Sequence, residues 1–198
     1  VAVELPRQVT SAEVQLLGTL AEIAGNTIHR MRLHEQTESR LQRLAALRSI
    51  DVAISASFDL RVTLGIIIDQ AESQLGADAV NVLLYNSVSQ TLTPLARRGF
   101  QGKDTGSLRL GHGLASQVLV GRKMISKLDL RNLEGVPADE GFMIYHGIPL
   151  IANGELKGVL EIFHRKPLRP NEEWRDFFEM LGGQTAIAIN HIALFDSL

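Results

Sequence analysis

The feature that most constrains this fold is a proline-free stretch that runs from residue 7 to residue 93. Proline breaks α-helices because it lacks an N–H and its ring clashes with the preceding turn. Apolar residues recur at helical spacing from about Ser11 to Ser55, with a polar interval over 34–40. The pattern predicts one very long helix, or two nearly collinear ones, of roughly 65 Å in length. A small domain cannot cover that length alone, so we expect a partner helix, although the heptads are too weak for a uniform coiled coil.

Residues 58–60 interrupt the first helical pattern, and a second helix follows, after which the periodicity changes from helical to alternating. Asp59 can cap a second helix that ends at Gly76, and Asn153-Gly154 is a strong signal for a hairpin turn. The later predicted elements are strands over 79–85, 91–97, 107–110 and 123–126, a short helix over 114–120, a hairpin of 142–151 with 155–164, and a last helix over 172–198. This order predicts an α+β fold in which helices cover one face of an antiparallel sheet and a cap of loops and a short helix covers the other.

Composition excludes several classes of function. The 198 residues are 45% hydrophobic and 21% charged, which is typical of a globular domain. A net charge of −2 gives no attraction for nucleic acid or an anionic membrane, so we expect neither as a partner. The absence of cysteine excludes a thiolate nucleophile, thiol redox chemistry, disulfides and a thioether-linked chromophore. Because no apolar run approaches the roughly 18 residues of a spanning helix and no secretion signal is recognisable, we expect a cytoplasmic location.

The two ends of the chain share a pattern at an offset of 161 residues. Leu20 aligns with Leu181 and Ile28 with Ile189. The other matched pairs are Leu16 and Leu17 with Phe177 and Phe178, Leu33 with Leu194, and Glu35 with Asp196. Any two amphipathic helices share some periodicity, so coincidence is one explanation. The other is a pair of tandem modules, which would repeat at about this spacing.

Four passages resemble the GAF domain family, in the family's order. They are GHGLA at 111–115 with GRK at 121–123, Asp129, the hairpin segments IPLI at 148–151 and KGVL at 157–160, and GQTAIAIN at 183–190 in the closing helix. The resemblance covers about residues 50–198. It implies a six-stranded antiparallel sheet, a pocket between the sheet and the cap, and dimerisation through helices.

The resemblance also implies a domain organisation. Residues 1–38 are expected to be the C-terminal helix of a preceding GAF domain and a linker helix, and residues 39–198 the GAF domain itself. The missing initial methionine fits an excised fragment.

At several positions this chain differs from the pattern of the family, and these differences argue against some of its subgroups. Ser116 stands where many members have glycine, so the short helix can pack differently. The cyclic-nucleotide subgroup has an asparagine-lysine pair, a phenylalanine and an aspartate-glutamate pair where this chain has other residues over 164–172, which argues against cyclic GMP or AMP. The bilin-binding and methionine-sulfoxide-reducing subgroups need cysteines that this chain lacks.

Candidate ligand contacts combine apolar side chains with a few polar groups near the predicted cap. They are Arg97, Phe100, Met124, Asp129 and Tyr145. Ordinary core or surface positions explain each of them as well. The amides after the glycines at 111 and 113 could bind an anion, although turn geometry also accounts for these glycines.

We expect neither a catalytic residue nor a metal site. His34-Glu35 is similar to the phospho-acceptor segment of histidine kinases, but a solvated helix face explains it and 198 residues leave no room for an ATP-binding domain. His29 and His34 are five residues apart, whereas paired metal ligands on a helix stand four apart. No serine-histidine-acid set has a defensible spacing.

These observations predict a signal-transduction sensory domain. It would bind an unidentified small molecule and relay the binding through dimeric helices to an output domain, such as that of a histidine kinase or a cyclic-di-nucleotide enzyme. The alternative is a GAF domain that binds no ligand and serves as a dimerisation scaffold. The sequence identifies no cofactor and gives no reason to expect enzymatic activity from the isolated domain.

Overall fold

The chain forms two compact units, Val1–Leu44 and Ala45–Leu198, in a computed structural model. The structure describes residues 11–56, 60–102, 106–111, 113–130 and 140–195, and for 12–13, 51, 53–56 and 192–195 it describes the backbone alone. In its described part the first unit is helix. The second unit holds the sheet and the remaining helices, and its boundary does not test the expected division after residue 38.

Ten elements follow one another along the chain. The helices are α1 (Ser11–Ala56), α2 (Leu60–Leu75), α3 (Gly113–Gly121) and α4 (Glu172–Phe195). The strands are β1 (Ala79–Asn86), β2 (Thr91–Arg98), β3 (Leu108–Arg109), β4 (Ile125–Lys127), β5 (Ile144–Ala152) and β6 (Glu155–His164). Within the described residues, no helix combines the length and hydropathy needed to cross a membrane.

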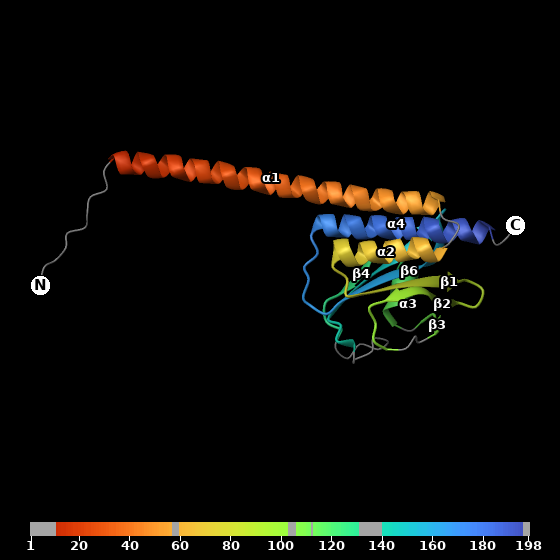
Figure 1. The fold of residues 1–198 in the computed structure, drawn as a ribbon. Helices are drawn as coiled ribbons and strands as arrows, with labels where there is room; N and C mark the ends of the chain where they lie inside the picture. The colour runs from red at the N-terminus through yellow and green to blue at the C-terminus, as the bar shows by residue number, and fades with distance from the viewer. Residues whose placement is uncertain (1–10, 57–59, 103–105, 112, 131–139, 196–198) are drawn as a thin grey trace, which may run out of the picture. The chain divides into compact units, whose positions relative to one another are not determined.

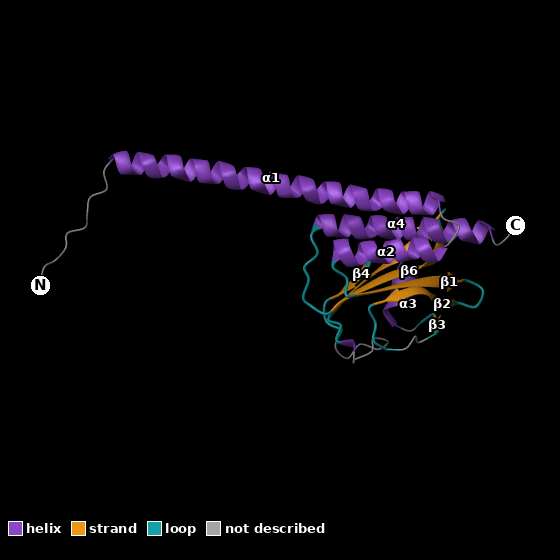
Figure 2. Cartoon of the chain, viewed as in Figure 1, coloured by secondary structure: helices purple, strands orange, loops and turns teal. Residues whose placement is uncertain are grey.

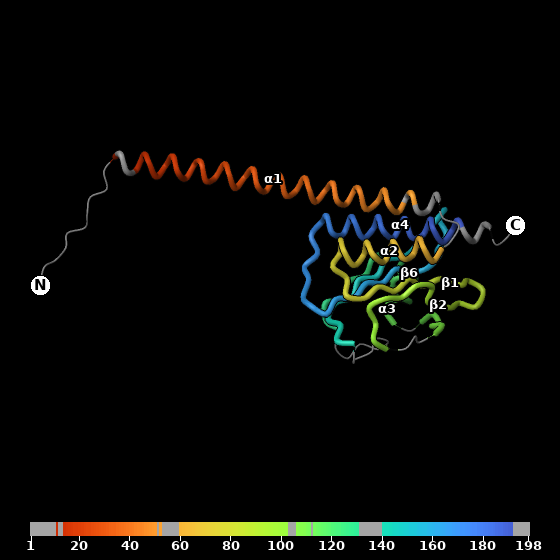
Figure 3. Tube along the Cα trace, in the orientation of Figure 1, coloured from red at the N-terminus to blue at the C-terminus, as the bar shows by residue number. Residues whose placement is uncertain are grey.

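The strands form one antiparallel sheet of six in the order β3-β2-β1-β6-β5-β4. Helices α2 and α4 lie side by side over one face, where α4 contacts β5 and β6 and α2 contacts β1 and β2. Helix α3 packs on the opposite face against β5 and β6. Figures 2 and 3 show the layers, with the loops around α3 on the side away from α2 and α4. The predicted α+β fold is confirmed.

The two faces of the sheet carry two separate cores. The helix-side core joins Val80, Leu160 and Ile162 to residues of α2, α4 and the end of α1, such as Ile50. The cap-side core joins Leu83, Val159 and Phe163 to α3. Successive side chains of a strand point to opposite faces, and both faces are covered, so β1 is mostly apolar and β6 is apolar over 158–163 except for Glu161. Burying a side chain such as Phe178 in either core stabilises the fold by about 1.5–3 kcal/mol.

Gly158 lets the two central strands approach each other. It pairs with Leu84 across the β1–β6 ladder, and a Cβ at residue 158 would collide with the backbone carbonyl oxygen of Leu83. A carbonyl in a ladder cannot move away as a side chain can. The residue is therefore glycine for steric reasons.

The structure differs from the predicted elements at a few ends. The strand expected over 123–126 is β4, and the first hairpin strand begins at Ile144 rather than at residue 142. Asn153 and Gly154 have positive φ angles of 52° and 80°, as the predicted tight turn requires. The expected helix cap at Asp59 lies outside the described residues, as does His112 of the predicted glycine motif.

A glycine pair tests this packing. Gly158→Ala should lower the free energy of unfolding by about 3 kcal/mol, because the added methyl group has no space. Gly65→Ala is the matched control in α2, where a Cβ meets nothing within 4 Å. It should raise stability by up to about 1 kcal/mol through helix propensity. Urea denaturation measures the stability of both variants. Equal stabilities would contradict the close approach of β1 and β6 at Gly158.

Candidate functional site

The candidate site lies on the cap side of the sheet, inside a group of aromatic rings. Phe163 of β6 is at the centre: its ring centroid is 5.4 Å from that of Phe100, 4.9 Å from Phe142 and 5.3 Å from Tyr145. Most of these contacts are edge-to-face, the arrangement that aromatic quadrupoles favour. The rings make an apolar surrounding in which any polar group is costly to bury.

A row of polar residues crosses the sheet through this surrounding. The strand registers place Arg97 opposite Asn81, Asn81 opposite Glu161, and Glu161 opposite Gly147. Glu161 is only 6% exposed, and its Oε2 accepts a hydrogen bond of 2.9 Å from Asn81 Nδ2. In the middle of a central strand, this acid is held by the Asn81 amide, and the Tyr145 hydroxyl also favours its charged form.

Three polar atoms of the cap side are buried without a hydrogen-bond partner among the described residues. They are Asn81 Oδ1, Tyr145 OH and, on α3, Ser116 Oγ. Each such atom costs about 1–3 kcal/mol relative to a satisfied one. Buried polar atoms are otherwise nearly always paired. Two of these atoms, on Asn81 and Tyr145, belong to residues that interact with Glu161, and such a group is typical of a site that receives polar groups from a ligand.

Burial controls the protonation of this cluster. It raises the pKa of Glu161 to about 7, with the Asn81 hydrogen bond and the Tyr145 hydroxyl acting in the opposite direction. Burial also raises the pKa of Tyr145 well above its ordinary value, and the nearby Glu161 charge adds to this shift. At neutral pH, Glu161 is thus close to half-protonated and can either donate or accept a hydrogen bond.

Gly147 provides the space in which the tyrosine lies. A Cβ at this residue would collide with the Tyr145 hydroxyl, and it would come within 2.8 Å of Val118 on α3. The Tyr145 side chain therefore lies along β5 between the strand and the cap helix. Its position depends on a glycine two residues further along the same face.

The ion pair of Glu140 and Arg165 connects the loops at the rim of the site. The Glu140 carboxylate accepts backbone N–H groups from Gln101 and Gly102 at 2.8–2.9 Å, and Arg165 Nη2 lies 3.4 Å from it. Arg165 also donates to the carbonyl oxygens of Glu140 and Gly99, at 3.0 and 2.9 Å. Although burial opposes ionisation, these N–H groups and the charges of Arg165 and Arg97 hold the pKa of Glu140 below its usual value.

The structure brings together some of the residues predicted as ligand contacts. Phe100 and Tyr145 both pack in the cap-side core, and the Arg97 guanidinium lies 4.2 Å from the Phe100 ring centroid. Met124 packs instead against the helix-side core, and Asp129 is exposed in the segment after β4. Ligand contact by any of the five stays a prediction.

Asn81, Glu161, Glu140 and Arg165 were not among the candidates predicted from the sequence. A signal for Glu161 was present, because it is the one ionisable residue in the apolar stretch 158–163. Glu140 and Arg165 are 25 residues apart, and no spacing rule relates them.

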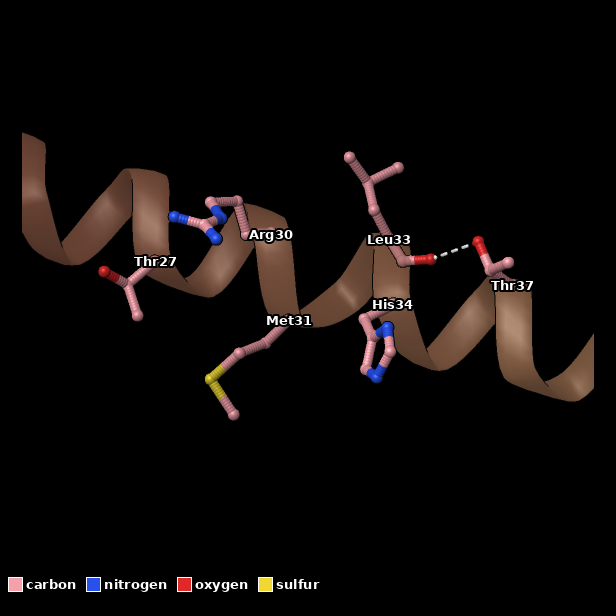
Figure 4. Close-up of a pocket in the computed structure, with 6 residues that line it drawn as sticks. All are labelled: Thr27, Arg30, Met31, Leu33, His34 and Thr37. Carbon is pink, nitrogen blue, oxygen red and sulfur yellow. Dashed lines mark hydrogen bonds between the residues drawn. The ribbon is translucent and has the colours of Figure 1, made fainter.

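Other features of the described chain do not form a site. Figure 4 shows a hollow lined by six residues that all come from α1, between Thr27 and Thr37. Each of the six is exposed, and the hydrogen bond within the group runs from Thr37 Oγ1 to the carbonyl oxygen of Leu33 at 2.8 Å. It is the outer surface of one helix. In the described residues no three histidine or acidic side chains form a group that could hold a metal ion.

The comparisons with known proteins agree with this architecture. The family model of the GAF domain matches residues 58–190. None of the curated proteins compared with the chain matches it. Among solved structures, the GAF domain of a phosphoenolpyruvate-protein phosphotransferase from Coxiella burnetii is 25% identical with a TM-score of 0.70, covering 80% of this chain and 98% of its own.

Two further structures share the fold. The GAF domain of an Acinetobacter phosphoenolpyruvate-protein phosphotransferase has a TM-score of 0.68 at 22% identity, over 79% of this chain and 98% of its own. The GAF domain of a two-component sensor histidine kinase from Bacillus halodurans has a TM-score of 0.62 at 19% identity, over 71% and 99%.

The pH dependence of Glu161→Gln tests the electrostatics of the site. The folded-state pKa lies above the unfolded value of 4.5, so the contribution of Glu161 to stability is complete below pH 4.5 and is lost as pH rises through about 7. At pH 8 the variant should therefore be more stable than the wild type, by on the order of 3 kcal/mol. The difference should shrink towards pH 4.5.

Glu155→Gln is the matched control on the same strand. Glu155 is exposed, and its hydrogen bond with Lys157 lowers its pKa. Its substitution should change the pH profile little and in the opposite sense. Denaturation series at several pH values measure both, and a constant difference for Glu161→Gln would contradict the assignment.

Proposed function

This chain belongs to the GAF domain family, and on that premise we propose that it is the sensory domain of a cytoplasmic signalling protein. A small molecule would bind between the sheet and the cap and would change how the helices present themselves to an output domain. The observation that carries the proposal is that the buried acid Glu161 interacts with Asn81 and Tyr145, each of which has a buried polar atom without a partner among the described residues. A ligand with hydrogen-bonding groups would satisfy them.

The proposed binding step uses two states of the cap side. In one state Tyr145 lies over Gly147, as in this structure. In the other the ligand occupies this space and pairs with Asn81, Glu161 and the displaced hydroxyl. A ligand shifts such an equilibrium only by its difference in affinity for the two states. The polar atoms provide that difference, because they are satisfied only when the ligand is bound.

The sheet offers a short route from the site to α4. Leu160 and Ile162 flank Glu161 and face the helix-side core. Phe177, Phe178 and Leu181 of α4 pack in the same core. A shift of β6 caused by a ligand on the cap side would therefore act directly on α4, the last helix, which leads towards the C-terminus.

We also propose that a second copy of the chain covers the exposed apolar residues of α1. Leu17, Leu20 and Ile28 are exposed by more than half. Ten large apolar side chains from Val14 to Leu44 are exposed by half or more, and a solvated helix seldom carries so many. Two copies paired through residues 11–55, with the final helix taking part, would bury them.

The output of the parent protein is proposed by analogy with the relatives. One of the similar structures comes from a two-component sensor histidine kinase, which favours a kinase output. Others come from a phosphotransferase, a reductase and a chemotaxis protein. We propose that this domain regulates such an output rather than catalysing a reaction.

A ligand-free scaffold is the second candidate. The observation that favours it is the packing of Tyr145, which is fully buried in the cap-side core. Two methionines do not help to fill the cap side: Met143 is exposed, and Met124 packs on the other side of the sheet. The scaffold would space and pair the helices without sensing anything.

Native mass spectrometry of the freshly purified chain separates sensor from scaffold. We expect an additional small-molecule mass that is lost on denaturation and is reduced in Tyr145→Phe. That variant should keep its stability or gain up to about 1 kcal/mol, because it loses an unpaired hydroxyl. Tyr85→Phe, at the other tyrosine, should keep the ligand. A wild-type protein that never carries or gains a small molecule would favour the scaffold.

Light scattering tests the helical dimer independently. At tens of micromolar the chain should have the mass of two copies. Leu20→Glu should reduce this mass, because it places a charge in the proposed apolar contact. Gln15→Glu adds the same charge at a polar exposed position and should leave it unchanged. A wild-type mass of one chain would overturn the dimer.

A further inference from the structure

A pair of histidines is buried on the helix side of the sheet, opposite to the candidate site. His146 of β5 and His164 of β6 are 0% and 3% exposed. Their ring centroids are 5.7 Å apart, with an interplanar angle of 78°. Both rings contact the indole of Trp174 on α4, at centroid distances of 4.6 and 6.2 Å. Buried histidines are uncommon unless their nitrogens are paired.

Each imidazole is held by one nitrogen only. His164 Nδ1 lies 3.0 Å from the carbonyl oxygen of Gly76, so this nitrogen carries the proton and Nε2 has a lone pair. His146 Nδ1 lies 2.7 Å from Ser126 Oγ. Both Nε2 atoms are buried without a partner among the described residues. In the imidazolium form of either ring, the Nε2–H would have no acceptor among the described residues.

These contacts bring α2 and the strands β5 and β6 together with the start of α4. Trp174 is in the first turn of the helix, where Asn171 Oδ1 accepts its backbone N–H at 2.8 Å. Its indole Nε1 donates to the carbonyl oxygen of Leu75 at the end of α2, at 3.1 Å. The histidine pair thus lies beneath the point where α4 and α2 meet the sheet.

Burial disfavours imidazolium at both rings. Burial, together with the neighbouring His164 and Arg175 of α4, lowers the pKa of His146 to about 4. Burial also lowers the pKa of His164, against the Gly76 hydrogen bond and the charge of Asp78 before β1. Asp78 is itself engaged, because its Oδ2 accepts the backbone N–H of Arg165 at 2.6 Å. Ser126 on β4 and Trp174 on α4 carry no charge.

We propose that the His146–His164 pair is an acid-sensitive contact, which holds the first turn of α4 on the sheet while both rings are neutral and releases it when a ring is protonated. Opening lets water solvate the new charge, whereas the closed state buries it beside another imidazole and near a guanidinium. The contact would therefore respond to pH through the same helix that the proposed function uses as its output.

The direction of the pH response follows from the linkage between protonation and stability. The folded-state pKa values lie below the ordinary 6.5, so the contribution of the pair to stability is complete above pH 6.5 and declines as pH falls towards 4. The open population should rise by up to about tenfold per pH unit for each histidine that is protonated only when open. This response is independent of the proposed function, because it needs no ligand and lies on the other face of the sheet.

Trp174 is the only tryptophan of the chain, so its fluorescence reports on the contact directly. Between pH 7.5 and 4.5 the wild-type emission should fall or shift to the red, since imidazolium quenches indole and opening exposes it to water. Hydrogen exchange at pH 5, corrected for the intrinsic rate, should increase over residues 172–178 more than in β1. An emission that stays constant over this range would overturn the proposal.

Substitutions identify the titrating groups. Asparagine places an amide near the position of Nδ1 and does not titrate, so His146→Asn combined with His164→Asn should abolish the transition. His191→Asn on the exposed side of α4 is the matched control and should keep it. The same transition in the double variant would overturn the proposal. If that variant does not fold, wild-type exchange decides: increased exchange confined to 172–178 supports the contact, and unchanged exchange at pH 5 contradicts it.

Discussion

The structure depends on the need to bury both faces of strand β6. This strand pairs with β1 on one side and β5 on the other, while α4 covers one face and α3 the other. It therefore cannot alternate between apolar and polar residues as a half-exposed strand does. Every polar side chain within its buried part must be paired or must bear a cost. Its two buried polar residues, Glu161 and His164, are the places where the structure bears that cost.

These two residues respond to pH in opposite senses for the same physical reason. Burial favours the neutral form of each. Glu161 becomes charged as pH rises, so the cap side is weakened by alkali; the histidine pair becomes charged as pH falls, so the helix side is weakened by acid. Because the two groups lie on opposite faces of one strand, their effects reach different elements. The cap responds to the first, and α4 with the end of α2 responds to the second.

The comparison of α1 with α4 separates local pattern from tertiary burial. Leu16 and Leu17 are both 62% exposed, whereas the matched Phe177 and Phe178 are 1% and 0% exposed. Both segments are helical and have similar spacing, so helix propensity does not explain the difference. Helix α4 lies on a sheet of its own unit, while residues of α1 up to Leu44 belong to a separate unit. An amphipathic pattern shows that a face needs a partner, and it does not identify the partner.

The sequence alone determined the order of elements, the long first helix, the Asn153-Gly154 turn and the sheet with helices on one face, because periodicity and turn chemistry are local. It also pointed to Arg97, Phe100 and Tyr145 near the cap. Only the tertiary structure placed Asn81 beside Glu161, 80 residues away, and His164 beside Gly76, 88 residues away. Strand register decided that Asn81 lies opposite Glu161. Burial and the lack of a partner, which give these groups their chemistry, exist only after the chain has folded.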